Sequence, residues 1–285
     1  IYKNIYNLLY ISLYNFYTDN KKGGGVMTQL NDMQKKQILR LALYAGEIML
    51  KNGAATYRVE DTITRICKSK KLKHISAFVT PTVIIVSDDR FDGYSFIKRI
   101  KFRNTDLNKV AMINDFSREF ILDDLDIWEG IKELKKIDKA PSYKTLTKMI
   151  WAGLASGMFA LIFGGKISDF IVAFFISMIA MISFEKLERL SETSFLANAA
   201  ASFIIGILAI VVRKIGFGHS LDMVIVGSIM PLLPGVALTN GIRDFISGDL
   251  ISGVSRVSEA LLTAIAIAVG IGSALKLLIM LGGVI

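Results

Sequence analysis

The sequence contains very few of the residues that build disulfide bonds and metal sites. Its 285 residues include one cysteine, Cys67, and two histidines, His74 and His219. A single cysteine excludes an internal disulfide and a cysteine-based metal site. The histidines lie in different halves of the chain, and neither has neighbours with the spacing of a zinc-ligand set. We therefore expect no bound metal and no prosthetic cofactor.

The signatures of common enzyme classes are also missing. The sequence has no Gly-x-Ser-x-Gly, no His-Glu-x-x-His and no P-loop. Arg58, Glu60 and Asp61 lie on the polar face of a predicted helix, where contact with solvent is the simplest role. We expect a protein that is not an enzyme. A hydrolase, the alternative, would need a pair of carboxylates in a pocket of the soluble half.

Positive charge is plentiful but is not gathered on one basic face. The net charge is +9, and Lys and Arg are spread among acidic residues. Nucleic-acid binding requires a clustered basic surface, so we expect no nucleic-acid partner. Positive charge beside anionic lipid on the cytoplasmic side of a membrane is the simpler interpretation.

The chain has two halves of different character. Residues 29–148 are rich in Lys, Arg, Asp and Glu, whereas residues 149–285 are mostly apolar. The apolar runs are long enough for transmembrane helices, which need about 20 residues each. We predict a cytoplasmic α+β domain over residues 27–142 and a transmembrane domain over residues 143–285.

Residues 1–26 have a different explanation. Ile1 is not a normal initiator, and codons for Lys22-Gly-Gly-Gly can read as a ribosome-binding site just before Met27. We expect an upstream segment that is not translated, with synthesis starting at Met27. A disordered segment, or a signal or anchor segment, is the alternative, although a charged n-region and a small-residue cleavage site are not evident.

The predicted soluble domain alternates helical and extended patterns. Apolar residues at helical spacing predict a helix over residues 30–50, and a second helix follows Gly53 with Thr56 as its N-cap. The β-branched run 78–86 predicts one strand and residues 94–102 a second. Helices are expected over 106–120 and 123–139, the latter with Asp123 and Asp124 in its first turn. The expected order is α-α-β-β-α-α.

Five transmembrane helices are expected in the apolar half. Gly153-x-x-x-Gly157 and Ala197-x-x-x-Ala201 predict close helix packing. The predicted spans are 145–165, 167–185, 194–213, 219–239 and 255–280.

The distribution of positive charge predicts the orientation. Lys144 and Lys148 precede the first span, which places the soluble domain in the cytoplasm. Arg213 and Lys214 then fall on the outer side, against the rule. The odd number of spans suggests one part of a transporter.

The most informative stretch runs from the fourth span into the fifth. Prolines break helices, so Pro231 and Pro234 should leave the carbonyls of Gly227 and Met230 without their usual partners, free to contact a cation or a polar substrate. Residues 241–250 are too short and polar to span and should form a turn or short helix at the cytoplasmic interface. The candidate transport residues are Pro231, Pro234, Gly235, Asn240, Arg243, Asp244, Gly248, Asp249, Arg256 and Glu259.

The charges in this stretch have distinct predicted roles. Arg243 and Asp244 are adjacent, so they point in different directions and need separate partners. Arg256–Glu259 is the expected internal pair, and Asp249 could also reach Arg256. Either arginine could bind a substrate carboxylate, and Asp244 or Glu259 could carry a proton.

Other polar residues of the apolar half carry weaker predictions. Asp222 is either a relay group or a solvated helix end, and Asn198 binds either substrate or a neighbouring helix. Glu185 and Glu188, with the basic residues beside them, are expected in an exposed loop.

The chain resembles the threonine/serine exporters of bacteria from about residue 33 onward. The resemblance rests on the run from Leu50 to Glu60, and more strongly on the run from Pro231 to Asp249 with Arg256–Ala260. It implies proton-driven export of small polar metabolites across the inner membrane of a bacterium. It also implies a split form, in which a separate small membrane protein supplies a second set of spans. Such split pairs resemble dicarboxylate (succinate) exporters.

The sequence therefore predicts half of an exporter that works by alternating access. The expected substrate is threonine or serine, with a succinate-like dicarboxylate as the alternative; the expected partners are the small membrane protein, a small polar metabolite and the lipid bilayer, with a homo-oligomer left open. A membrane-tethered regulatory protein would be favoured if the charges around Asp244 paired only with one another and were dry.

Overall fold

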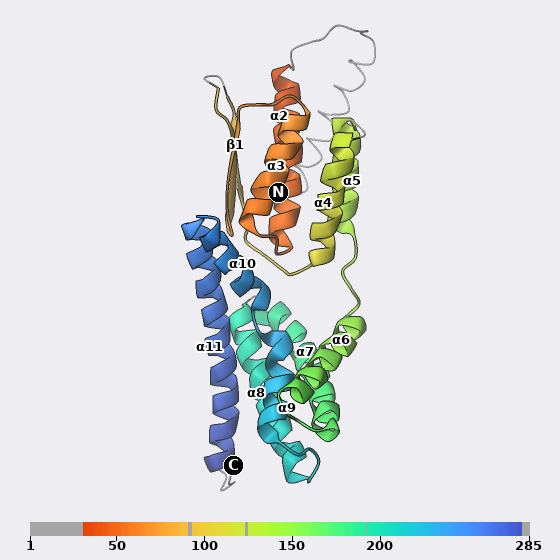
Figure 1. Ribbon diagram of the computed structural model, residues 1–285, viewed down its shortest axis with the longest axis vertical. Coiled ribbons are helices and arrows are strands. Elements are labelled where there is room, and N and C mark those ends of the chain that lie inside the picture. The colour runs from red at the N-terminus through yellow and green to blue at the C-terminus, as the bar shows by residue number, and fades with distance from the viewer. Residues whose placement is uncertain (1–30, 91–92, 123–124, 192, 281–285) are drawn as a thin grey trace. The chain divides into compact units, whose positions relative to one another are not determined.

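The computed structural model describes residues 31–90, 93–122, 125–191 and 193–280. The chain forms two compact units, which meet in sequence between Ala140 and Pro141. The first contains four described helices and a small sheet, and the second is helical (Figure 1).

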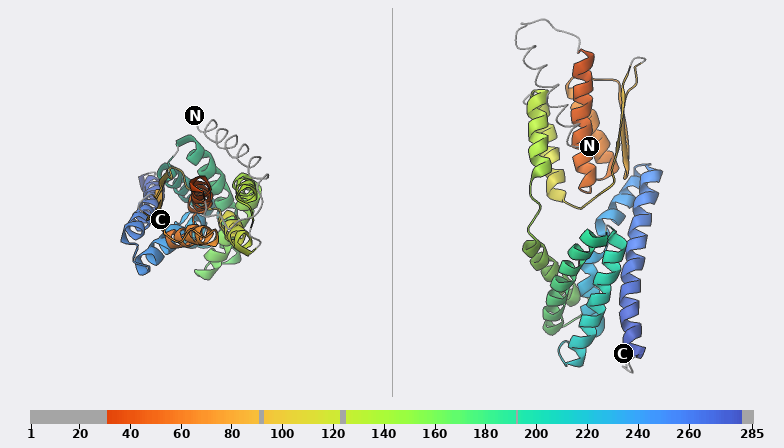
Figure 2. Two further views of the ribbon diagram at one scale, coloured as in Figure 1. Left: turned by 90° about the horizontal axis from the view of Figure 1, so that it is seen from above. Right: turned by 180° about the vertical axis from the view of Figure 1, so that it is seen from behind.

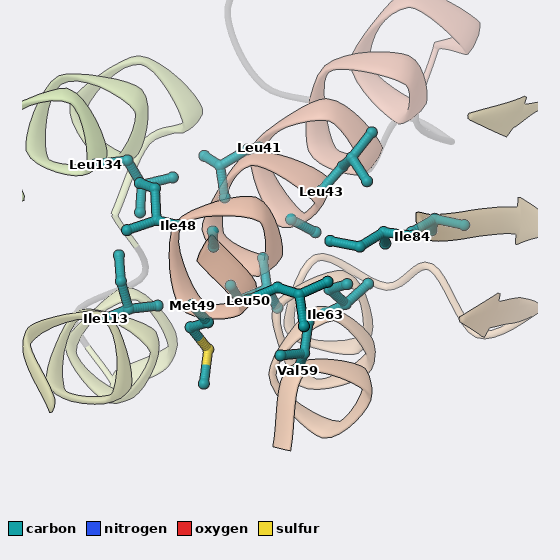
Figure 3. Close-up of a cluster of buried hydrophobic side chains, with 14 of the residues drawn as sticks. Leu41, Leu43, Ile48, Met49, Leu50, Val59, Ile63, Ile84, Ile113 and Leu134 are labelled. Atoms are coloured by element: carbon teal, nitrogen blue, oxygen red, sulfur yellow. The ribbon is translucent and has the colours of Figure 1, made fainter. Parts of the chain in front are cut away.

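The first unit is built around helix α2 (Asp32–Lys51). Its apolar residues recur on several faces, so the helix is covered on all sides rather than along one stripe. Figure 3 shows these side chains reaching Val59 and Ile63 of α3 (Thr56–Ser69), Ile84 of the sheet, and Ile113 and Leu134 of two later helices. Each fully buried aliphatic side chain contributes about 1.5–3 kcal/mol, so this contact set forms the core of the unit.

The sheet has three antiparallel strands, β1 (Ile75–Thr80), β2 (Val83–Asp88) and β3 (Ser95–Arg99), in the order β1-β2-β3. The prediction of a single strand over 78–86 is wrong. Thr80 pairs with Val83, and Pro81-Thr82 form the turn between two strands. Proline cannot donate to a strand ladder, so a turn is where it costs least. The order of the unit is therefore α-α-β-β-β-α-α.

Two helices complete this unit, α4 (Leu107–Leu122) and α5 (Ile127–Lys139). The Asp126 side chain caps α5 by accepting a bond of 3.3 Å from the Trp128 amide. Asp123 and Asp124, which we expected in its first turn, lie outside the described residues. The N-cap of α3 is Ala55, and not Thr56 as predicted; Thr56 is the first helical residue and is fully buried.

The second unit contains the apolar helices. Its elements are α6 (Thr145–Ile162), α7 (Ile167–Ser191), α8 (Ser194–Lys214), α9 (Leu221–Ile229), the short 3₁₀ helix η1 (Met230–Leu232), α10 (Gly235–Ile246) and α11 (Leu250–Met280). In the described part of the chain, four helices are long and apolar enough to cross a membrane. The segments 221–232 and 235–246 pass the same test only as a pair and are bent by 62° at the break between them, as in a broken span or a re-entrant loop.

Small residues hold these helices together as predicted. A Cβ atom on Gly153 or Gly157 would lie 2.9 Å or less from an aromatic ring of α7. In the same way Gly206 of α8 abuts Ala274 of α11, and the two helices run side by side (Figures 1 and 2). Close backbone approach replaces the hydrophobic effect as the source of association in lipid.

The predicted loop around Glu185 is part of a helix. Helix α7 continues to Ser191, and the Glu185 carboxylate accepts bonds from Lys148 at 3.2 Å and Thr145 at 3.0 Å. Glu188, on the same helix, accepts a bond of 2.9 Å from the Ser194 hydroxyl. These acids therefore connect helices within the unit instead of lying in an exposed loop.

Candidate functional site

The prolines interrupt the helical segment at the expected place. Helix α9 ends at Ile229, η1 includes Pro231, and Pro234 is the N-cap of α10. The prediction that the carbonyls of Gly227 and Met230 are free is wrong. The Gly227 oxygen accepts a hydrogen bond from the Met230 amide, and the Met230 oxygen accepts one from the Leu233 amide. The tighter 3₁₀ pattern supplies donors one residue earlier than an α-helix does, so both carbonyls are used locally.

Helix α10 begins immediately after the break and continues to Ile246. The Thr239 hydroxyl donates to the Gly235 oxygen one turn earlier, at 2.7 Å. The segment that we predicted at the interface, 241–250, is thus mainly the second half of a helix. Its remainder is a turn that joins α10 to α11.

Gly248 makes this turn. Its φ is +88°, a conformation that side chains with a Cβ rarely adopt. The Gly248 amide bonds to the Phe245 oxygen at 3.1 Å and the Asp249 amide to the Asp244 oxygen at 2.8 Å. These two bonds define a Schellman motif, which ends a helix while pairing its last carbonyls. The chain then reverses into α11, so α10 and α11 form a helical hairpin.

Two glycines let the arms of the hairpin approach closely. A Cβ on Gly241 would lie 2.9 Å from the Val257 side chain, and one on Gly253 would lie 2.7 Å from the Phe245 ring. Any larger residue at either position would push the arms apart.

A buried ion pair joins the two arms. The Arg256 Nε atom lies 3.1 Å from Asp244 Oδ2, and the two side chains are 5% and 0% exposed. Removing a pair of charges from water costs several kcal/mol per ion, which close pairing only partly offsets. Asn240, one turn before Asp244, is buried on the same arm.

The other predicted charges lie elsewhere on the hairpin. Arg243 and Glu259 are exposed, so the adjacent residues Arg243 and Asp244 do point in different directions, as predicted. We expected Arg256 to pair with Glu259 or Asp249. Its ion-pair partner in the structure is the buried Asp244. Burial, and then the charge of Asp244, raise the pKa of Asp249 in the turn.

Several polar residues that sequence reasoning missed or misplaced lie at other points of this unit. The Asp169 carboxylate is fully buried and accepts bonds from the amides of Lys166, His219 and Ser220, at 2.8, 2.5 and 3.1 Å. It therefore ties the loop before α9 to the start of α7. The signal was an acid at the beginning of an otherwise apolar helix.

Other buried polar groups of these helices include two serine hydroxyls and one amide. Ser156 Oγ and Ser228 Oγ are buried and have no hydrogen-bond partner among the described residues. The Asn198 side chain donates to the Ser194 oxygen of its own helix at 2.8 Å, and not to a neighbouring helix. Asp222 lies exposed in the first turn of α9. Within the described ranges no three His, Cys, Asp or Glu side chains are grouped to hold a metal ion.

Comparison with known proteins identifies relatives for most of the chain. The chain is 20% identical over 255 residues to the "Probable succinate transporter subunit YjjP" of Klebsiella aerogenes. The aligned region covers 87% of this chain and 97% of that protein. It is 22% identical over 257 residues to the "Probable threonine/serine exporter" of Mycobacterium tuberculosis, covering 88% of this chain but only 47% of the relative. No solved structure matches.

The family model of the threonine/serine exporters (ThrE) matches residues 40–278. This range begins within α2 and includes the rest of the first unit, the proline break, α10 and α11 as far as Leu278. The chain therefore belongs to the threonine/serine exporter family, a family of membrane transporters.

Proposed function

We propose that this chain is a subunit of a proton-driven exporter of small amino acids, threonine and serine, and that the α10–α11 hairpin is its transport element. The observation that carries the proposal is the buried Asp244–Arg256 pair, 3.1 Å between Arg256 Nε and Asp244 Oδ2. Ionisable groups inside membrane domains are costly, and they commonly mark the paths of substrates and protons.

The chemistry of the pair suggests how it works. A substrate carboxylate carries the same group as the Asp244 side chain and can replace it on the Arg256 guanidinium, which binds carboxylates through two parallel bonds. Asp244, released from Arg256, pairs with the ammonium group of the amino acid. On the outer side Asp244 takes up a proton, which displaces the ammonium group and releases the substrate. The proton is then carried inward, and its loss to the cytoplasm restores the Asp244–Arg256 pair, so one proton enters as one substrate leaves.

This cycle assigns roles to the predicted residues. Arg256 is the substrate-binding cation and Asp244 the proton carrier; exposed Arg243 and Glu259 serve at the mouth of the path. Gly248 and the break at Pro231 and Pro234 act as the hinges about which the hairpin moves. Hinges are residues at element ends that absorb a change in backbone angles.

The proposed setting is the inner membrane of a bacterium, with the first unit in the cytoplasm and a separate small membrane protein as partner. The match to nearly the whole of a relative named as a transporter subunit supports a partner. The chain spans about half the length of a relative named as a threonine/serine exporter.

Two other functions have support of their own. A dicarboxylate such as succinate is the alternative substrate, since two relatives are named as succinate transporter subunits. A regulatory role is the alternative to transport, because Asp244 and Arg256 pair with each other and are buried. Transport assays separate all three.

The test is efflux from cells that lack their own exporters. The chain is produced alone and with the small membrane protein encoded beside it, and cells loaded with a threonine dipeptide are followed for threonine and serine, with succinate in parallel. We expect efflux of threonine and serine only with the partner. Succinate efflux alone would move the substrate to the dicarboxylate, and no efflux with both proteins in the membrane would reject transport.

Variants then test the mechanism. We expect Asp244→Asn and Arg256→Gln to lose efflux while both stay in the membrane, because each removes one half of the exchange. Arg189→Gln is the matched control, since that side chain is 79% exposed and lies 4.0 Å from its acid. Full efflux by both pair variants would reject these roles.

A further inference from the structure

A cavity of about 550 Å³ lies at one end of the second unit. It is formed where α8 and α11 end and α9 begins. Apolar residues of α8 and α11, Ile210 and Leu278, line it together with the charged residues Arg213, Lys214 and Asp222 and with His219. A volume of this size accommodates a small solute or a lipid headgroup.

This cavity is remote from the buried ion pair. Leu278 and Arg256 lie on the same helix, α11, 22 residues apart. A helix rises 1.5 Å per residue, so about 33 Å separate them, close to the thickness of the hydrocarbon core of a bilayer. The two polar regions therefore lie at opposite ends of the apolar unit.

The walls of the cavity are held in place by named contacts. The Arg213 guanidinium donates to the Gly218 oxygen at 3.0 Å, and Lys166 Nζ lies 3.5 Å from His219 Nδ1. The buried Asp169 carboxylate accepts hydrogen bonds from the amides of His219 and Ser220, and these bonds fix the loop that contains His219. A cationic cavity with an anchored loop binds an anion with little reorganisation, and this preorganisation raises affinity.

The charges around the cavity favour an anion. Arg213 and Lys214 are permanent cations from the last turn of α8, and the Lys166 ammonium lies against the His219 ring. Asp222 is the one carboxylate among the described lining residues and opposes an anion. Two lining cations outweigh it. Arg213 and Lys214 are the two basic residues that the sequence analysis placed on the outer side, against the positive-inside rule. A role in binding an anion explains their position.

We propose that this cavity is an oxyanion-binding site, in which Lys214 and Arg213 hold a carboxylate or phosphate group and Asp222 limits its affinity. The proposal rests on the geometry of the second unit. Only its placement at the exit of a transport path, where a carboxylate solute would leave, rests on the proposed function. The same chemistry could be supplied by a free dicarboxylate or by the phosphate of a lipid headgroup.

The test uses the full chain in micelles of dodecyl maltoside, a detergent that carries no phosphate or carboxylate. Succinate binding is measured by isothermal titration calorimetry, with neutral succinamide as the ligand control. We expect Lys214→Gln to weaken binding about tenfold, as is typical for loss of one charge-assisted contact, and Asp222→Asn to strengthen it several-fold. Lys276→Gln is the matched control, because Lys276 is a cation near the same end of α11 that is not among the described lining residues.

A second arm identifies the source of the oxyanion. The measurement is repeated in nanodiscs that contain phosphatidylglycerol, and bound lipid is counted by native mass spectrometry. Phosphatidylglycerol adducts that are lost in Lys214→Gln but kept in Lys276→Gln, without succinate binding, would assign the site to a lipid headgroup. The proposal is overturned if neither ligand binds, or if the three variants affect binding equally. Because no transport is measured, these outcomes are independent of the efflux assay.

Discussion

The buried pair of Asp244 and Arg256 makes a quantitative prediction about stability. Each partner is removed in turn, as Asp244→Asn and Arg256→Gln, and the two changes are then combined. Both side chains are at most 5% exposed, so each single variant removes the ion-pair partner of a charge that stays buried. Breaking a buried pair in this way costs about 3–5 kcal/mol of the free energy of unfolding.

The double variant should recover much of that loss. Both charges are gone, and the two amides can bond to each other in the same place. We expect the sum of the two single-variant losses in the free energy of unfolding to exceed the loss in the double variant by at least about 2 kcal/mol. This difference is the coupling energy of the pair, and the value is within the range for residues in direct contact. The pair Glu185–Arg189 of the same unit is the control, with side chains 13% and 79% exposed and 4.0 Å apart. Its coupling should not exceed about 0.5 kcal/mol.

Tryptophan fluorescence can follow this unfolding in the relevant unit. The sequence has two tryptophans, of which Trp151 lies in α6 and Trp128 in α5. In a Trp128→Phe background, titration of micelle-bound protein with dodecyl sulfate therefore reports the second unit. A coupling below about 0.5 kcal/mol between Asp244 and Arg256 would show that water solvates each charge separately, and would refute the reasoning.

Three further predictions follow from other contacts. Gly241→Leu should destabilise the protein by about 1–3 kcal/mol through overpacking between the arms of the hairpin, measured by the dodecyl sulfate titration. A Cβ atom on Gly235 would meet open space, so Gly235→Ala should leave that titration unchanged. Burial raises the pKa of the Cys67 thiol to about 12, so maleimide at pH 7.5 should label it only after unfolding, and rapid labelling of the folded chain in a mass-spectrometric time course would contradict this. Arg90 beside Asp88 lowers the pKa of that carboxyl, so its contribution to stability is present above the ordinary pKa of about 4 and is lost as the pH falls through the lower folded value. Asp88→Asn should therefore be less stable than the unchanged chain at pH 7, with the difference narrowing below about pH 4, and a difference that is constant between pH 7 and pH 3 would argue against the pairing.

The sequence by itself determined the features that depend on composition and local pattern. The division into a charged half and an apolar half, the approximate positions of the helices and the break at Pro231 and Pro234 could all be predicted. A hydrophobic run shows where a helix can cross a bilayer, and a proline in the interior of a helical pattern interrupts the helix. Small residues such as Gly153 and Gly157 also carry their packing role in their spacing.

Only the tertiary structure decided which polar groups meet. The sequence indicated that Asp244 and Arg256 both needed partners. Their pairing, however, depends on the Schellman turn at Gly248 and on the close approach at Gly241, which set how the two arms face each other. The carbonyls near Pro231 were predicted to be free, but the 3₁₀ geometry of η1 satisfies them.

The same reason explains the other differences. Whether Pro81 interrupts a strand depends on the partner strands available to the residues on each side. The burial of Asp169 depends on a loop 50 residues away in the sequence, whose amides bond to it. Helix and strand patterns are set by neighbours along the chain, whereas ion pairs and buried hydrogen bonds are set by distances between segments, and these distances exist only once the chain has folded.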